Sequence, residues 1–390
     1  AEAQADSIAE LLGVERTRHA ALEALHSFGG EAVGRHAARI AAECLEDADC
    51  ATRQLAVGTL GLCRQASRTE GAGVASGIAV LLHSPLPGVR AAAALALGHL
   101  GEPALPHVSD LCALLGDVEE DLSGLAAQMG ATQLRPHPAL RKPRCAALVS
   151  LGMLGRVRCE LGASEWEPLT RMLPALQEED WEARCCTLEA LLELGESAAR
   201  PGAEDAAPLL DDEAYLVRAR ACSVLGMCRY SHATDQLVDA LVDSSPTVRA
   251  AALLALGALG RGSREVVDGA RSCLDDPVGT VRAAACRTLG QLGESGRCYA
   301  GLVAEALGVD PDPCVRRAAV EALGGMGAHG AAFSEEVAEA LGDEDPSVSG
   351  AAAEALGTLL AEGAPSVPAS GLGKTAPAGH GAAVQQEHTK

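Results

Sequence analysis

The sequence predicts an all-α protein, namely an α-solenoid that forms a right-handed superhelix of about ten helix pairs. One observation is a repeated segment: Val248–Gly260 reads VRAAALLALGALG, and close copies of it occupy 89–101, 281–293 and 315–327. A segment that recurs at nearly constant spacing indicates a repeat architecture. The other observation is that the apolar residues of each copy recur at steps of three and four, which is typical of a helix and not of a strand.

The copies align on the arginine that follows the first valine of the motif. Neighbouring copies then lie 31 to 40 residues apart, except for one gap of 54 residues between Arg90 and Arg144. Each unit is therefore long enough for two helices and two short loops. The aligned positions are Arg18, Arg53, Arg90, Arg144, Arg184, Arg218, Arg249, Arg282, Arg316 and, in a tenth copy, Ser349.

The motif is expected to begin a helix, because a proline lies two residues before the valine in four copies and a Ser or Asp precedes three of these prolines. A capping oxygen followed by proline at the first helical position is a helix start. The residues are Pro87, Pro246, Pro313, Pro346, Ser245, Asp312 and Asp345. The glycines of the closing LGxLG favour a turn. A second amphipathic segment follows in several units, at 104–115, 234–242, 264–274, 299–307 and 334–341.

An acidic residue lies six positions before the motif arginine in most copies. In a stack of similar units, this spacing places each acid at a turn between repeats, beside an arginine of its own or the next repeat. We expect the two groups to form a ladder of charge-assisted hydrogen bonds along the array. Its members are Asp47 and Arg53, Asp212 and Arg218, Asp243 and Arg249, Asp276 and Arg282, and Asp310 and Arg316.

The pattern DxxxxVRxxAxxALGxLG resembles the HEAT repeat family, and in particular the short HEAT-like repeats of phycobilisome lyases, over residues 11–362. The resemblance implies an armadillo-like α-solenoid whose second helices line the concave, partner-binding face. Tetratricopeptide and ankyrin repeats fit less well, because their Trp and Tyr positions and their TPLHxA motif have no counterpart.

Two regions depart from the repeat and define the expected organisation. We expect a solenoid over 1–362 that carries an insert loop at about 116–142, and a disordered tail rich in Gly, Ala, Ser and Pro over 363–390. The insert begins with the acidic residues Asp117, Glu119, Glu120 and Asp121. It is either a solvated loop or eroded repeat, or a loop that contacts a partner.

Composition excludes several classes of function. The net charge of −22 disfavours nucleic acid and anionic membrane surfaces as partners, and no stretch has the length and apolarity of a membrane span. The 14 cysteines show no CxxC spacing and fit small apolar positions of the repeat, so we expect buried, reduced thiols in a cytoplasmic, intracellular protein. Because the chain begins at Ala1 and not at Met, its N-terminus is expected to be incomplete.

No motif for catalysis, metal binding or cofactor binding stands out. The sequence lacks HExxH, GxSxG, a P-loop and the His-Glu dipeptides of the HEAT-like deoxyhypusine hydroxylase. We therefore expect no catalytic residue, no metal and no cofactor, and a non-catalytic scaffold for protein–protein interaction. The enzymatic alternative is a bilin lyase or lyase subunit, which only the resemblance suggests.

The second segments carry acidic residues between their apolar positions, and these are the candidate partner-binding residues. If they face outward, they bind a basic peptide or protein segment along the concave face; the alternative is that they only keep the protein soluble. The candidates are Asp235, Asp239, Glu265, Asp268, Glu305, Glu335, Glu336 and Glu339.

Overall fold

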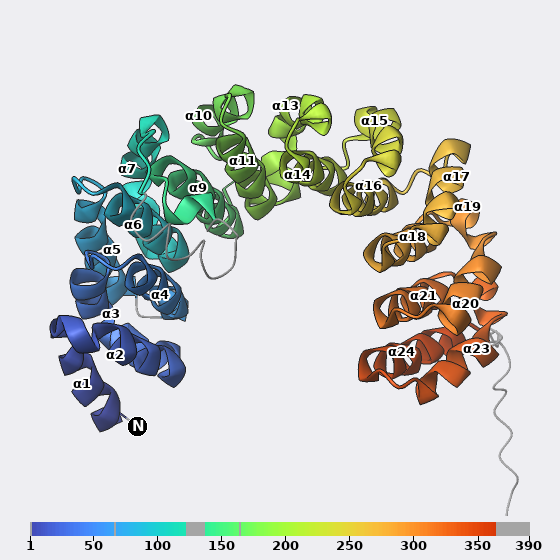
Figure 1. Cartoon of the computed structure of the whole chain (residues 1–390), viewed down its shortest axis with the longest axis horizontal. Helices are drawn as coiled ribbons and strands as arrows, with labels where there is room; N and C mark the ends of the chain where they lie inside the picture. The colour runs from blue at the N-terminus through green and yellow to red at the C-terminus, as the bar shows by residue number, and fades with distance from the viewer. Residues whose placement is uncertain (1, 66–67, 122–136, 164, 364–390) are drawn as a thin grey trace, which may run out of the picture.

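The computed structural model describes residues 2–65, 68–121, 137–163 and 165–363. Within these ranges the chain forms α-helices and 3-10 helices and no β-strand. The helices stack in chain order into an open arch, with the N-terminal helices at one foot and the C-terminal helices at the other (Figure 1). The prediction of an all-α solenoid is confirmed.

Each copy of the motif lies in one helix, and together these motif helices form one of the two rows of the solenoid. Their bounds follow the sequence motif closely, since α16 ends one residue before Gly260, which adopts the left-handed conformation with φ 64°. The motif helices are α2 (Glu15–Phe28), α4 (Cys50–Gly61), α6 (Pro87–Leu100), α9 (Pro143–Glu160), α11 (Trp181–Leu194), α14 (Tyr215–Met227), α16 (Pro246–Leu259), α18 (Gly279–Gln291), α21 (Pro313–Gly325) and α24 (Pro346–Gly363).

The second helices form the other row, and from residue 108 onward each is shorter than the motif helices. In the C-terminal half most of them end in a 3-10 turn, such as Ala240–Val242 after α15, and the ladder acid follows directly. The second helices are α3 (Gly30–Cys44), α5 (Arg68–Leu81), α7 (Val108–Ala113), α10 (Leu169–Met172), α13 (Ala203–Ala206), α15 (Thr234–Asp239), α17 (Arg264–Ser272), α20 (Ala300–Val309) and α23 (Ser334–Glu339). The remaining α-helices are α1 (Glu2–Glu10) and the single turns α12 (Glu196–Ala199), α19 (Glu294–Arg297) and α22 (Ala328–Ala331).

The helix starts are capped largely as the sequence indicates. The Asp312 carboxylate accepts a hydrogen bond from the backbone N–H of Cys314 at 2.9 Å, and Asp345 accepts one from Ser347 at 2.8 Å. Ser245 also occupies the residue before a helix, but its hydroxyl makes no capping hydrogen bond. Proline stands at the start of α6, α16, α21 and α24, where its missing N–H leaves no hydrogen bond unmade.

The motif helices line the inside of the arch, and second helices such as α15 and α17 lie on its outside (Figure 1). The expectation that the second helices form the concave face is therefore wrong. The reason is that neighbouring helices pack more closely within the row of motif helices than within the row of second helices. Motif helices touch one another along much of their length, whereas second helices of neighbouring repeats touch at far fewer points.

Small residues allow this close approach of the motif helices. A Cβ atom added at Gly226 would lie 2.6 Å from Cα of Ala255 in the next motif helix, and one at Gly152 would lie 2.6 Å from Cα of Ala190. Because the inner row is spaced more tightly than the outer row, the stack curves toward the motif helices.

The interior between the two rows is filled by Leu, Val, Ala and Cys. Ten of the cysteines are buried, and Cys298 and Cys314 are the exposed ones. Among the described residues, no helix is both long enough and apolar enough to cross a lipid bilayer. The last helix extends to Gly363, so residues 364–390 of the expected tail lie outside the described residues, as do residues 122–136 of the insert.

Candidate partner-binding grooves

From α11 to α21, the motif arginine of each motif helix is hydrogen-bonded to the acid of the following repeat. Nε and Nη2 of the guanidinium donate to the two carboxylate oxygens of one aspartate, at 2.6 to 2.9 Å. Such two-point contacts fix both orientation and distance. The pairs are Arg184 with Asp212, Arg218 with Asp243, Arg249 with Asp276, Arg282 with Asp310, and Arg316 with Asp343.

The same arginines also hold the turn of their own repeat. Nη1 of Arg249 donates to the backbone carbonyl of Asp243 at 2.9 Å, and the Asp243 carboxylate accepts the N–H of Ser245 at 2.7 Å. Asp243 is thus fixed by its own backbone and by Arg218 of the preceding repeat. The pKa of Asp243 lies below its ordinary value, chiefly because of the hydrogen bond from Arg218. These charges are satisfied within the protein and hold successive repeats together.

In the N-terminal half, some of the acids that pair with the motif arginines come from the insert and not from the repeat itself. Arg18 pairs with the carboxylate of Asp47, and Arg53 donates to the Asp47 carbonyl oxygen at 2.7 Å. The position six residues before Arg90 is Ser84, which has no carboxylate. Arg53 instead pairs with Asp121 from the start of the insert.

Acidic residues of the insert also pair with the next motif arginine, Arg90. Arg90 pairs with Asp117 at 2.7 Å and with Glu119 at 2.6 Å. Arg144 then pairs with Glu178, at the ordinary acid position of the following repeat. The acidic start of the insert therefore supplies carboxylates to Arg53 and Arg90 where the repeat itself has none.

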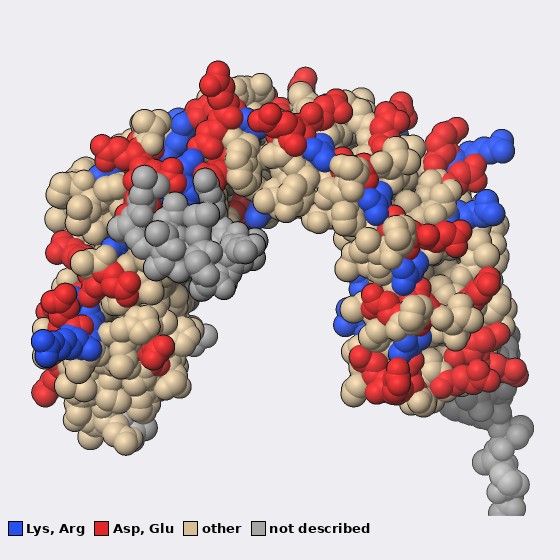
Figure 2. Space-filling view, viewed as in Figure 1, with Lys and Arg blue, Asp and Glu red and all other residues tan. Residues whose placement is uncertain are grey.

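Open grooves lie beside the ladder in the C-terminal repeats. Each lies between a ladder pair and the ends of second helices, with volumes of about 290, 520 and 480 Å³ along the chain. Figure 2 shows basic side chains bordered by acidic ones along this face of the arch. The first groove contains Asp212, Arg218, Gln236, Asp239 and Asp243; the second contains Arg271, Asp276, Arg282, Leu302, Glu305, Val309 and Asp310; the third contains Val309, Asp310, Arg316, Glu336, Glu339, Asp343 and Glu344.

Four of the eight acidic candidates line these grooves: Asp239, Glu305, Glu336 and Glu339. All four are exposed, and none of them forms an ion pair with another residue that the structure describes. The other four, Asp235, Glu265, Asp268 and Glu335, are also exposed but line none of the three grooves. Asp268 pairs locally with Arg264 at 3.4 Å.

Apolar side chains accompany the acids in the grooves. Val309, which contributes to two grooves, is 73% exposed, and Leu302 is 37% exposed. The second and third grooves therefore combine exposed carboxylates with exposed apolar side chains.

The sequence analysis missed a second group of polar residues, away from the grooves. His137, Cys186 and Glu189 lie within reach of one another. Cys186 and Glu189 are three residues apart on α11, a spacing that places both on one helix face. His137 comes from the far end of the insert, so no local pattern links it to the other two.

Comparisons with known proteins agree with this architecture. A family model described as HEAT repeats matches residues 203–290 and 299–369. No curated protein matches the chain significantly. Among solved structures, the karyopherin Kap121p bound to the extreme C-terminus of the protein phosphatase Cdc14p has a TM-score of 0.54 at 13% identity, with 91% of this chain and 41% of that chain covered.

Two further Kap121p structures are similar in the same way. Kap121p bound to Nup53p has a TM-score of 0.56 at 12% identity, with 92% of this chain and 42% of that chain covered. Kap121p bound to Pho4p has a TM-score of 0.56 at 13% identity, with 89% and 40% covered. This chain thus spans about two fifths of the Kap121p chain, and at such low identity the likeness concerns the fold alone.

Proposed function

Residues 203–290 and 299–369 of this protein are HEAT repeats, and from that premise we propose that it is a non-catalytic scaffold that binds a basic segment of a partner protein in the grooves beside its ladder. The observation that carries the proposal is the row of exposed carboxylates at Asp239, Glu305, Glu336 and Glu339. The ladder aspartates are already paired with arginines, whereas these four are free to attract a cation.

The repeat architecture supports this function. An array of stacked repeats presents similar grooves in series, so that one extended segment can contact several of them. The net charge of −22 favours a basic partner at long range. Kap121p, which has a similar fold, has been solved with Nup53p and with Pho4p bound, so a solenoid of this kind can hold a protein partner.

Site-specific cross-linking can identify the partner and its bound segment. A photo-reactive amino acid in place of Leu302, in the second groove, is irradiated in a cell extract, and the cross-linked peptide is identified by mass spectrometry. We expect a peptide rich in Lys or Arg. A photo-reactive residue in place of exposed Glu265, which lines no groove, is the matched control and should not give this peptide.

Charge reversal then tests the carboxylates against neighbours on the same helices. Asp239→Lys and Glu339→Lys should each weaken binding of the identified segment by roughly tenfold, which corresponds to about 1.4 kcal/mol. Asp235→Lys and Glu335→Lys make the same charge change one helical turn away and should have much less effect. Equal losses from both sets would show that only overall charge matters, and unchanged binding would rule out the grooves.

A further inference from the structure

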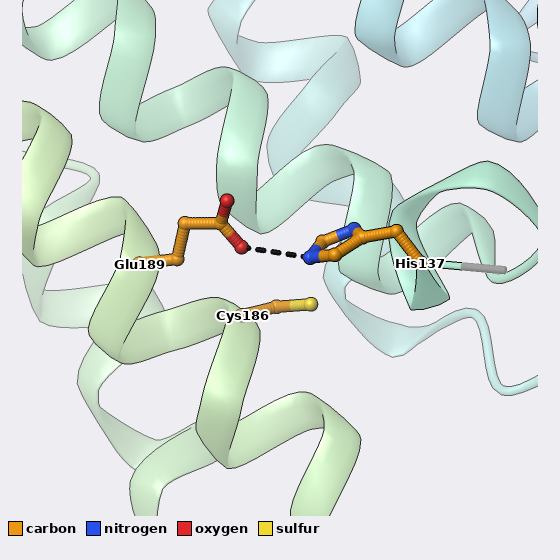
Figure 3. Close-up of side chains that lie close together, drawn as sticks. All are labelled: His137, Cys186 and Glu189. Atoms are coloured by element: carbon orange, nitrogen blue, oxygen red, sulfur yellow. Dashed lines mark ion pairs between the residues drawn. The ribbon is translucent and has the colours of Figure 1, made fainter. Parts of the chain in front are cut away.

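Three different metal-binding side chains converge beside α11. His137 Nε2 lies 3.0 Å from Glu189 Oε2, and the ligand atoms of His137, Cys186 and Glu189 all lie within 4.8 Å of one another. Figure 3 shows the imidazole and the carboxylate pointing toward each other, with the Cys186 thiol turned toward both. We propose that His137, Cys186 and Glu189 form a binding site for one zinc ion.

The donor set fits zinc better than other common divalent cations. Zinc binds thiolate, imidazole and carboxylate together, whereas calcium and magnesium prefer oxygen alone. A tetrahedral zinc ion would hold the three ligand atoms about 3.4 to 3.6 Å apart, as follows from its usual bond lengths. The present separations, 3.0 Å between His137 Nε2 and Glu189 Oε2 and at most 4.8 Å within the cluster, lie close to these values.

The charges around the cluster also suit a divalent cation. With zinc on Nε2 and the imidazole proton on Nδ1, which gives up the hydrogen bond from the Ala139 N–H, the Cys186 thiolate and the Glu189 carboxylate would together balance the two positive charges of zinc. Glu189 Oε2 is buried and accepts no well-aligned hydrogen bond, although His137 Nε2 lies 3.0 Å away and the nearest Arg220 nitrogen 3.6 Å away. A buried carboxylate oxygen such as Glu189 Oε2, which lacks a well-aligned hydrogen bond and faces a thiol and an imidazole, is expected in a metal site without its metal.

The arrangement does not fit a catalytic triad. In a triad the acid orients one ring nitrogen and the nucleophile contacts the other. Here Nε2 faces Glu189, while Nδ1 accepts the backbone N–H of Ala139 at 3.3 Å. Cys186 is buried and its pKa is raised well above the usual value by its contact with Cys145 and by burial, so its thiol is a poor nucleophile on its own.

Zinc at this position would connect the far end of the insert to the middle of the solenoid. His137 precedes the 3-10 turn Pro138–Leu140, whereas Cys186 and Glu189 belong to α11. The metal would therefore hold His137 and the turn that follows it against α11. Its role would be structural.

Cobalt(II) is the probe for this site, because a thiolate bound to it gives a charge-transfer band and tetrahedral coordination gives visible d–d bands. All proteins carry Cys298→Ser and Cys314→Ser, which remove the exposed thiols. We expect the full chain to bind one equivalent of cobalt with both bands, and zinc to displace it.

Matched variants distinguish the proposed ligands from their neighbours. His137→Gln and Glu189→Gln should each weaken cobalt binding more than about 100-fold, since loss of an outer partner alone costs about 10- to 100-fold. Cys186→Ala should abolish the charge-transfer band. The controls are Glu193→Gln, one turn further along α11, and Cys222→Ala, a buried thiol in the next motif helix, and both should bind cobalt normally.

Two results would overturn the site. One is the absence of a thiolate band in the parent protein at one equivalent of cobalt. The other is a band that survives Cys186→Ala in a variant whose circular dichroism shows it to be folded. If Cys186→Ala does not fold, the two partly exposed ligands decide the question, and unchanged affinity in His137→Gln and Glu189→Gln would refute the proposal.

Discussion

Arg249 in α16 and Asp276 before α18 join consecutive repeats through two parallel hydrogen bonds, Nε to Oδ2 at 2.8 Å and Nη2 to Oδ1 at 2.9 Å. Both side chains are largely buried, at 13% and 9% exposure. A largely buried pair of this kind contributes to stability mainly because removal of one partner leaves the other charge without compensation.

Asp276→Ala is therefore expected to destabilise the protein by about 1–3 kcal/mol, the cost of leaving a buried hydrogen-bonding group unsatisfied. Urea unfolding followed by far-UV circular dichroism measures the loss, and amide hydrogen exchange should show that α16 and α18 open first. The control is Asp275→Ala, because Asp275 is exposed and adjacent; it should change stability by less than about 0.5 kcal/mol. Equal effects of the two variants would contradict a role for the ladder.

The contribution of the ladder is also expected to depend on pH. The pKa values of Asp243 and Asp343 are lowered, mainly by hydrogen bonds from Arg218 and Arg316. A carboxylate whose pKa is lower in the folded than in the unfolded state stabilises the folded protein. This contribution is fully present above the unfolded-state pKa of about 3.9, and it is lost as the pH falls through the folded-state pKa.

Asp243→Asn tests this dependence directly. The difference in melting temperature between wild type and variant should be largest near pH 7, constant down to about pH 5, and smaller below about pH 4, where the wild-type carboxylate becomes protonated. Asp211→Asn, at an exposed residue of the first groove, serves as the control. A difference that stays constant to pH 3 would mean that the charge of Asp243 does not matter.

The sequence was sufficient to predict the helices but not the partners of their charges. The motif, its proline and its closing glycine determine where α16 begins and ends, because they are local signals. The spacing of six residues between Asp243 and Arg249 is also local, yet the Asp243 carboxylate pairs with Arg218, 25 residues earlier. Which of two nearby arginines a carboxylate contacts depends on how consecutive repeats are positioned relative to each other. A single sequence does not show this relative position.

The direction of curvature was predicted wrongly for a related reason. The resemblance to HEAT repeats placed the second helices on the concave face, whereas the structure places the motif helices there. The necessary signal was present in Gly226 and Ala255, whose small size permits close packing of motif helices. The cluster of His137 with α11 could not be predicted, because nothing in the sequence fixes where the insert returns to the solenoid.

The cysteines are expected to react in two clearly separate groups. Burial raises the pKa of Cys222 and Cys286 to about 12, and both side chains are inaccessible, whereas Cys298 and Cys314 are exposed. Because the thiolate is the reactive species, brief iodoacetamide treatment at pH 8 should modify Cys298 and Cys314 first. Peptide mass spectrometry locates the label, and unfolding in urea should make all 14 thiols reactive. Early labelling of Cys222 in the folded protein would contradict this packing.

The close approach of motif helices can be tested at Gly226. Gly226→Ala gains up to about 1 kcal/mol in helix propensity, but its Cβ would overlap with Ala255, 2.8 Å from the Cβ of that residue. Overpacking typically costs about 1–3 kcal/mol, so we expect net destabilisation in urea and, because the inner row is forced apart, a larger radius of gyration by small-angle X-ray scattering.

Gly58→Ala is the matched control for this substitution, since Gly58 lies inside α4 and a Cβ there meets no atom within 4 Å. It should leave the scattering unchanged and leave stability equal or raise it by up to about 1 kcal/mol. The double variant Gly226→Ala with Ala255→Gly returns space to the contact and should recover the original curvature. If Gly226→Ala left the scattering unchanged, the curvature would have to originate elsewhere than in the contact between α14 and α16.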